Sequence, residues 1–410
     1  MQMTSASPGV SRPIDRWLVR TLLRIVGNPP VAFELADGHL EGPATEQPEI
    51  TLRLHDRAAL YELLHRPTRT FGELFTKGRL TVDGDVCNAL DVIYSTVLHM
   101  ERQSGPLRRL VRRMFQQNPR PNTLTRSREN IHTHYDLGND FYQLWLDREY
   151  TQYTCAYYPT HQATLEEAQA AKLELVCRKL ALQPGDRVVE AGGGWGGLAR
   201  YLARNHGVRV RSYNISREQV AYARGRAERE GLGNSIEYVE DDYRNITGSY
   251  DVFVSVGMLE HVGLENYRTL GATIDRCLKD DGRGLIHSIG QNVPRPLNAW
   301  IESYIFPGAY PPTLRQMMDI FEPVDMQIVD VENLRPHYAQ TLKHWRERFE
   351  ANADNVLDLF DENFVRAWRL YLSGSMSAFR TGQLQLYQVL FQRQGSAALP
   401  ITRERLFGDG

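Results

Sequence analysis

The chain has 410 residues, of which 42% are apolar and 24% charged, a composition typical of a soluble globular protein with a sizeable core. The length suggests roughly two or three domains, and the net charge of -2 is small but unevenly spread. No apolar run approaches the roughly 20 residues that a membrane-spanning helix needs, and residues 1–28 lack the apolar stretch of a secretory signal. The four cysteines show neither metal-ligand spacing nor a disulfide framework. We therefore expect a cytoplasmic protein without a metal site.

The first 105 residues predict a small α+β domain. Two segments alternate apolar and polar side chains, as strands do, at 31–35 and 50–54. Three segments have the spacing of helices, at 17–25, 57–64 and 89–100.

A basic segment at 106–128 follows this domain. From Arg102 to Arg128 there are eight arginines and no acidic residue. Residues Leu107–Phe115 predict a basic amphipathic helix, and two prolines in 117–122 indicate a linker. Such a helix attaches to an anionic membrane at about 1 kcal/mol per basic residue, or it packs on its own protein with its charges in water. Nucleic acid is a third partner for basic helices, but no nucleic-acid-binding motif supports it.

Residues 129–400 predict one long α/β domain. Strands are expected at 188–191, 208–213, 236–239, 252–256 and 284–289, with helices at 198–205, 217–229 and 267–278. This alternation predicts a parallel, doubly wound sheet with helices on both faces. A further strand is expected at 384–391. The aromatic-rich stretch 294–372 predicts a helical insertion able to roof a pocket for a bulky apolar substrate.

A glycine turn follows the first of these strands. Glycines at 192, 194 and 196 lie between strand and helix, where the backbone approaches a ligand closely. A dinucleotide site would need a carboxylate at the end of the second strand, and residues 213–216 contain none. The carboxylate instead precedes the glycines, at Glu190. This order is typical of class I S-adenosylmethionine-dependent methyltransferases, whose ligand carries an ammonium group and no pyrophosphate.

Five further segments narrow the family. They are His134–Tyr142, Tyr150–Tyr158, Met258–Gly263, Leu285–Gly290 and Tyr304–Gly308. Together, from about residue 130 to 393, they resemble the cyclopropane-fatty-acyl-phospholipid synthases and the related mycolic acid cyclopropane synthases and methyltransferases. The resemblance implies a class I methyltransferase fold, Rossmann-like with a helical insertion.

The resemblance also implies S-adenosylmethionine as the cofactor. The matching positions are Tyr153, Thr154, Glu190, Gly192, Gly194, Asn214, Gln219, Asp242 and Tyr243. Asn214 stands where relatives often have threonine, and either side chain can hydrogen-bond a ribose hydroxyl. Gly193 replaces a cysteine common in relatives, a change expected to matter little in a loop lined by backbone.

A bicarbonate site beside the sulfonium is a second implication. Its matching residues are Cys155, Glu260, His287, Ile289 and Tyr338. Methyl transfer to a cis alkene leaves a carbocation, and bicarbonate would remove a proton from the new methyl group to close the ring. His287 and Tyr338 would donate hydrogen bonds to the anion, and Glu260 would accept one or orient His287.

Each of these residues also has an ordinary structural explanation. Cys155 fits a small buried side chain, Glu260 a carboxylate capping a helix, and His287 a satisfied histidine at a strand end. His261 is expected to orient its loop. A cysteine common near the C-terminus of relatives is Ser375 here, which excludes a mechanism that needs that thiol.

The resemblance therefore predicts an enzyme that adds a methylene unit across a cis double bond of a phospholipid acyl chain in a bilayer, forming a cyclopropane fatty acid. Its N-terminal domain would bind lipid or pair protomers as a homodimer, and the protein would associate peripherally with the membrane. The nearest alternative is a fatty acyl C-methyltransferase that gives a methyl- or methylene-branched product. Two others are a catalytically silent lipid-binding protein and a methyltransferase acting on oxygen or nitrogen of a small molecule.

Overall fold

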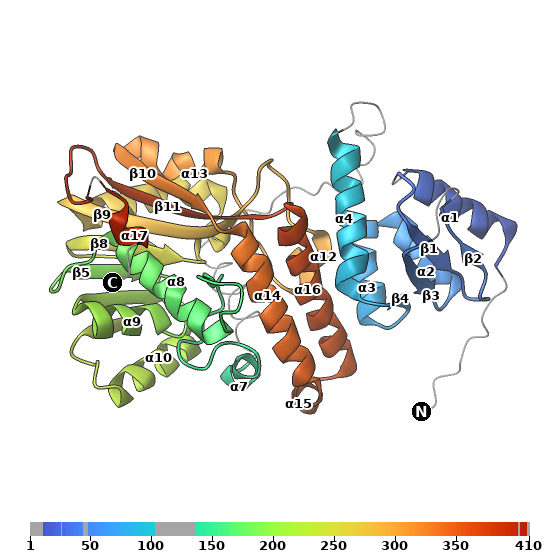
Figure 1. Cartoon of the computed structure of the whole chain (residues 1–410), viewed down its shortest axis with the longest axis horizontal. Coiled ribbons are helices and arrows are strands. Elements are labelled where there is room, and N and C mark those ends of the chain that lie inside the picture. The colour runs from blue at the N-terminus through green and yellow to red at the C-terminus, as the bar shows by residue number, and fades with distance from the viewer. Residues whose placement is uncertain (1–10, 26, 44–47, 103–136, 401, 408–410) are drawn as a thin grey trace. The chain divides into compact units, whose positions relative to one another are not determined.

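The computed structural model describes residues 11–25, 27–43, 48–102, 137–400 and 402–407 (Figure 1). They form two compact units that interleave along the chain. Unit 1 contains the described residues up to 102 together with Pro296–Ile305 and Phe349–Gln383, and unit 2 contains the rest. The predicted basic helix Leu107–Phe115 and the motif residues 134–136 lie outside the described part of the chain.

Unit 1 is an α+β unit built on a four-stranded sheet. Its strands run in the order β2-β1-β3-β4, with bounds Leu40–Glu41, Val31–Glu34, Ile50–Leu54 and Leu80–Asp83. Strand β1 pairs parallel with β3, and the other pairs are antiparallel. The helices are α1 (Pro13–Ile25), α2 (Arg57–His65), α3 (Pro67–Thr76), α4 (Val86–Arg102), α12 (Ala299–Tyr304), α15 (Ala353–Leu359) and α16 (Glu362–Thr381). Helix α16 packs on α3 and α4, and α12 packs on α3.

Unit 2 contains a seven-stranded sheet in the order β10-β11-β9-β8-β5-β6-β7 (Figure 1). The bounds are β5 (Arg187–Ala191), β6 (Arg209–Asn214), β7 (Ile236–Glu240), β8 (Tyr250–Val256), β9 (Leu278–Gly290), β10 (Met326–Asn333) and β11 (Gln385–Arg393). Strands β5 to β9 are parallel, and β11 is antiparallel to both of its neighbours. The predicted doubly wound α/β fold is thus confirmed.

Strand β10 corrects the expectation of a purely helical insertion between residues 294 and 372. It lies at the edge of the sheet, where its side chains alternate between more and less buried positions. Two of its valines, Val329 and Val331, are exposed. An edge strand needs little apolar character because only one neighbour and one face cover it, so its period-2 signal is weak.

Helices cover both faces of the sheet because successive strand residues point to opposite sides. On one face α8 (Leu165–Leu180), α9 (Gly197–His206) and α10 (Arg217–Arg229) pack on Val188, Val252 and Leu285. On the other, α11 (Tyr267–Cys277) and α13 (Leu314–Phe321) pack on Val189, Phe253 and Ile286. The remaining helices are α7 (Asn139–Gln143), α14 (Arg335–Ala351) and α17 (Glu404–Phe407), and short 3-10 turns lie at Tyr243–Asn245, Leu259–His261, Leu264–Asn266 and Glu322–Val324.

Strand order reverses between β5 and β8, since the chain continues from β5 to β6 on one side and returns to β8 on the other. In open α/β sheets ligands bind at such a switch point, outside the carboxyl ends of the strands. Within the described residues, no helix is both long and apolar enough to cross a bilayer.

Candidate active site

The glycine turn at the end of β5 is held in a conformation that L side chains rarely adopt. Gly192, Gly194 and Gly196 have φ angles of +87°, +51° and +78°. The amide groups of Gly192 and Gly193 both donate to the carbonyl of Tyr213, at 2.9 and 3.1 Å. A Cβ atom at Gly196 would overlap Tyr238 and Ala223. The turn therefore places backbone, rather than side chains, at the carboxyl end of the sheet.

A pocket opens over this turn. It encloses about 1040 Å³ outside protein atoms, part of it open to solvent. It is lined by residues that follow β5, β6, β7 and β8 and by the segment 151–154. All nine predicted cofactor residues line it: Tyr153, Thr154, Glu190, Gly192, Gly194, Asn214, Gln219, Asp242 and Tyr243.

The pocket also has a lining that the sequence did not predict. Among these residues are Gln152, Trp195, Asp241, Met258 and His261. Gln152, Trp195 and Asp241 each stand next to a predicted cofactor residue, and Met258 lies two residues before Glu260, so their positions in the sequence were the signal that could have found them. His261 was expected only to orient its loop. Burial lowers its pKa to about 4, so its imidazole is neutral at neutral pH.

Glu190 is buried beneath the glycine turn. Its Oε2 accepts a hydrogen bond of 2.5 Å from the Ser212 hydroxyl. Burial raises the Glu190 pKa to about 7, against the opposing effects of this hydrogen bond and of Lys172. A Cβ atom at Gly193 would overlap Ser212 Oγ. The glycine at position 193, where relatives have a cysteine, therefore does have a structural consequence. It leaves the room that Ser212 needs to reach Glu190.

Other cofactor candidates are ordered by their neighbours. Asn214 Nδ2 donates to Gln219 Oε1 at 2.8 Å and to the carbonyl of Gly194 at 3.2 Å. Asp242 accepts from Arg244 Nε at 2.7 Å and Nη2 at 3.0 Å. Side chains held in this way lose little freedom when a ligand binds.

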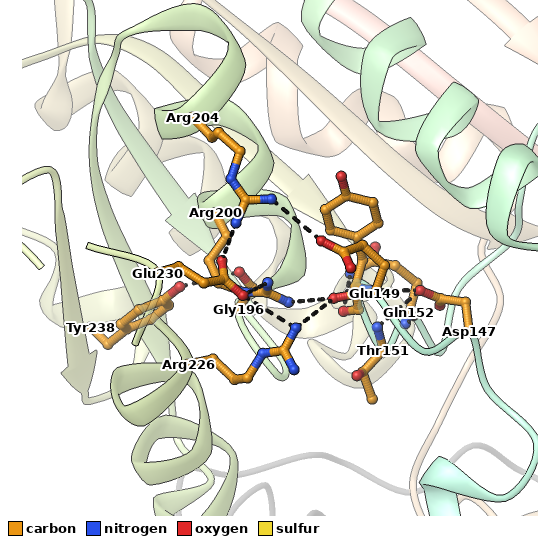
Figure 2. Close-up of polar contacts among 11 residues, drawn as sticks. Asp147, Glu149, Thr151, Gln152, Gly196, Arg200, Arg204, Arg226, Glu230 and Tyr238 are labelled. Atoms are coloured by element: carbon orange, nitrogen blue, oxygen red, sulfur yellow. Dashed lines mark hydrogen bonds and ion pairs between the residues drawn. The ribbon is translucent and has the colours of Figure 1, made fainter. Parts of the chain in front are cut away.

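One wall of the pocket is the segment that begins at Asp147, shown in Figure 2. The Asp147 carboxylate accepts from the amides of Tyr150, Thr151 and Gln152 at 2.7, 3.0 and 2.7 Å. Thr151 has a φ of +51°, which this carboxylate helps to maintain.

Arginines from α9 and α10 hold the same segment from the other side (Figure 2). Arg200, fully buried, donates to the carbonyl of Glu149 at 2.9 Å and to Glu230 Oε1 at 2.7 Å. Arg226 donates to the same carbonyl at 3.3 Å. The wall is thus fixed to the helices that cover the sheet.

The predicted catalytic residues Glu260, His287 and Ile289 meet at the carboxyl end of β9. Glu260 Oε1 accepts a hydrogen bond of 2.6 Å from the amide of Ile289. His287 Nδ1 lies 3.1 Å from Gln388 Nε2, and the His287 carbonyl accepts from Gly257 in the pocket wall at 2.8 Å.

Cys155 and Tyr338 reach the same place through the residue before α14. Cys155 Sγ lies 4.0 Å from the carbonyl of Leu334, which also accepts from the amide of Tyr338 at 3.3 Å. The amide of Leu334 donates to Leu386, whose register partner in β9 is Ile289. These backbone contacts connect the chain at Cys155 and Tyr338 to β11 and, through its pairing, to β9, where Glu260, His287 and Ile289 meet. Ser375 lies in α16 of unit 1.

Burial sets the protonation of this group. It raises the pKa of Glu260 to about 7, holds the pKa of His287 well below its usual value and raises the pKa of the Cys155 thiol. His287 is therefore neutral and Cys155 is a thiol at neutral pH. Glu260 Oε2 and His287 Nε2 are buried and have no partner within hydrogen-bonding geometry among the described residues, although the Ser288 hydroxyl is near enough to the Glu260 carboxyl group to lower its pKa. Buried polar atoms without protein partners can take their hydrogen bonds from a ligand or water at the site.

Comparison with known proteins identifies the family. The family model for mycolic acid cyclopropane synthetase matches residues 122–389. The chain belongs to this family. It is 34% identical over 92% of its length to a probable fatty acid methyltransferase from Pseudomonas putida, of which it covers 96%. It is 39% identical over 77% of its length to cyclopropane-fatty-acyl-phospholipid synthase from Escherichia coli K12, of which it covers 82%.

A solved structure supports the same conclusion. The mycolic acid cyclopropane synthase CmaA1, complexed with SAH and CTAB, is 29% identical with a TM-score of 0.62, over 65% of this chain and 98% of that one. These comparisons confirm the predicted family and the predicted class I methyltransferase fold. They also confirm that the protein is an S-adenosylmethionine-dependent methyltransferase.

Asp147 allows a test of the pocket wall. We expect Asp147→Ala to lower the free energy of unfolding by about 2–4 kcal/mol, because three amide donors lose their buried acceptor. Denaturant unfolding measures this change. Glu149→Gln is the matched control, because it changes only an exposed contact of the side chain with Arg204 at 3.3 Å and leaves the backbone carbonyl that Arg200 and Arg226 hold. Equal unfolding midpoints for the two variants would contradict this role of Asp147.

Proposed function

We propose that the protein transfers a methylene unit from S-adenosylmethionine to a cis double bond of a phospholipid acyl chain, forming a cyclopropane fatty acid. Membership of the family and the pocket over the glycine turn support the cofactor. The observation that carries the proposal is the pair of buried, unpartnered atoms, Glu260 Oε2 and His287 Nε2, beside the loop that follows β8.

The pocket fits S-adenosylmethionine by the chemistry of its lining. The cofactor supplies an electrophilic methyl group on a positively charged sulfur. Glu190 and Asp242 offer carboxylates to its ammonium and ribose groups, and Asn214 and Gln219 offer amides. The glycine turn adds an approach free of side chains. SAH in the related structure fits this assignment.

Bicarbonate fits the second group of residues, where it would supply a base for the methyl proton. His287 Nε2 would donate one hydrogen bond to it, because Nδ1 faces Gln388. Glu260 Oε2 would accept one from its hydroxyl, and the Tyr338 hydroxyl would donate another. Glu260 Oε1 is already held by the amide of Ile289, which fixes the direction of Oε2.

Aromatic rings beside the pocket support an apolar substrate and a cationic reaction. The Tyr153 ring lies 5.4 Å from Trp345 and 6.5 Å from Phe306, and Trp345 lies 6.0 Å from Tyr338. Ring faces stabilise a desolvated cation by about 2 kcal/mol, and close packing excludes the water that would quench it. CTAB, which carries a long alkyl chain, occupies the related structure.

A second candidate is a fatty acyl C-methyltransferase that gives a methyl- or methylene-branched chain. The relative that matches 92% of this chain is named a probable fatty acid methyltransferase, which favours this alternative. The same cationic intermediate leads to either product, depending on which proton is removed. The complete set of Cys155, Glu260, His287, Ile289 and Tyr338 favours ring closure.

Product analysis decides between the two. We expect vesicles of unsaturated phospholipid, incubated with the protein, S-adenosylmethionine and bicarbonate, to yield lipid with ring protons far upfield in proton NMR. Mass alone does not discriminate, since both products gain one CH2. New =CH2 or branched-methyl signals without ring signals would indicate C-methylation instead, whereas the vinylic signals of the cis alkene substrate are present before any reaction.

Glu260→Gln tests the anion site. We expect turnover to fall at least about 100-fold, with SAH affinity by calorimetry within about twofold of wild type. The pKa of Glu260 rises from 4.5 to about 7 on folding, so ionisation opposes folding increasingly between these pH values and fully above pH 7. The variant should therefore gain roughly 1–3 kcal/mol of unfolding free energy at pH 8, a gain that vanishes near pH 4.5.

The control for this variant is Glu265→Gln, which changes an exposed carboxylate on the next turn. It should keep turnover. Turnover near wild type in Glu260→Gln would remove Glu260 from the mechanism.

We further propose that the protein is cytoplasmic and docks peripherally on anionic bilayers, with its first 105 residues binding lipid or pairing protomers. Its four cysteines are buried free thiols, which fits a reducing compartment. On α1, Ile14 and Trp17 are 49% and 55% exposed and share a face with Arg24. Exposed tryptophan beside arginine is typical of helices that lie in the membrane interface.

The double variant Ile14→Ser/Trp17→Ser tests this face. We expect its binding to anionic phosphatidylglycerol vesicles, measured by sedimentation, to fall about tenfold because apolar burial in the interface is lost. Leu359→Ser is the control, since Leu359 on α15 is 51% exposed. Unchanged pelleting would contradict membrane docking by α1. If the double variant in solution without lipid has half the mass of the wild-type protein, the face pairs protomers instead.

A further inference from the structure

Lys172 is a lysine inside the protein. It lies on α8 and is 0% exposed. Lysine is almost never fully buried without a charged partner, because removing an ammonium group from water is costly. Among the described residues, no carboxylate lies within 4.0 Å of Lys172, whereas Lys179 on the same helix pairs with Glu332 at 2.5 Å. Something other than an ion pair must explain its position.

The contacts of Lys172 lead to the pocket wall. Its Nζ donates to Gln152 Oε1 at 2.5 Å and to Thr154 Oγ1 at 2.8 Å, and both residues line the pocket. Gln169, also fully buried and one turn earlier, donates to the carbonyl of Thr154 at 2.9 Å. The polar side chains on this face of α8 are therefore directed at the wall.

The ammonium group also adjoins the predicted catalytic residues, because Thr154, which its Nζ contacts at 2.8 Å, directly precedes Cys155. Its charge acts on Glu190 and Asp147 on the cofactor side, lowering the pKa of Glu190. On the other side it acts on Cys155 and His287: it opposes the rise that burial causes in the Cys155 pKa, and together with Lys179 it adds to the lowering that burial causes in the His287 pKa. Burial lowers the pKa of Lys172 itself to about 8, which leaves it mainly charged at neutral pH.

We propose that Lys172 is a positioning residue of the active site, which orders the Gln152–Thr154 wall against the cofactor and supplies the fixed positive charge for an anion beside Cys155 and His287. The ordering of the Gln152–Thr154 wall by Lys172 requires only that the protein binds its cofactor. The second half rests on the function proposed above. An anion bound beside His287 and Glu260 needs a positive charge from another residue, because His287 is neutral and Glu260 is an acid.

The test compares Lys172→Met with Lys179→Met in the full chain. Both changes remove a buried ammonium group from one helix at nearly constant length, but only the first frees Gln152 and Thr154. We expect Lys172→Met to weaken SAH binding about tenfold by calorimetry, the value of a hydrogen bond to a charged group. It should also raise the bicarbonate concentration for half-maximal turnover about tenfold. Lys179→Met should bind SAH within about twofold of wild type.

Two results would overturn the proposal. One is SAH affinity within about twofold of wild type in Lys172→Met. The other is an equal loss of SAH affinity in both variants. Removing either buried ammonium group of α8 would then act only through the stability of the protein. If Lys172→Met does not fold, Lys172→Gln replaces it under the same criteria. If wild type binds SAH but forms no cyclopropane, the proposed function fails and the contrast in SAH affinity still tests the wall.

Discussion

The functional part of unit 2 depends on buried polar contacts that hold one irregular segment, residues 147–158, across the carboxyl ends of the strands. Because this segment joins no sheet, its backbone groups need side-chain partners. Asp147 and Gln169 supply them at the pocket, and Thr341 of α14 accepts from the amide of Ala156 at 3.0 Å beyond Cys155. The cofactor wall and the candidate catalytic thiol are therefore positioned by one set of contacts.

The site also buries two carboxyl groups, which a protein core built only for stability would avoid. Glu190 and Glu260, in the two halves of the site, both have a pKa raised to about 7 by burial. A carboxyl group so tuned ionises when a positive charge comes near. A cofactor that carries a sulfonium and an ammonium would favour the ionised form of each. Cofactor binding would thus offset part of the cost of burying these acids.

Local patterns in the sequence predicted much of this arrangement. The β-branched runs and the helices between them gave strands β5 to β9, and the glycine spacing with Glu190 gave the turn. The full set of nine pocket residues came from the resemblance to the family and not from spacing. Strand β10 was missed because an edge strand needs little apolar periodicity. The return of 296–305 and 349–383 to unit 1 was missed because packing between distant segments leaves no local signal. Lys172 resembled any helical lysine, since a lone charge in a helix is normally solvated.

Position 193 shows how a local interpretation fails when two positions share one space. Taken alone, a glycine in a backbone-lined turn has no consequence for its ligand. In the folded protein its missing side chain is the space that Ser212 Oγ occupies, and Ser212 in turn bonds Glu190. A side chain at 193 would need a smaller residue at 212 and would cost Glu190 its hydrogen bond. The pair at 193 and 212 therefore acts as one unit, and the ionisation of the pocket carboxylate in this chain depends on both residues together.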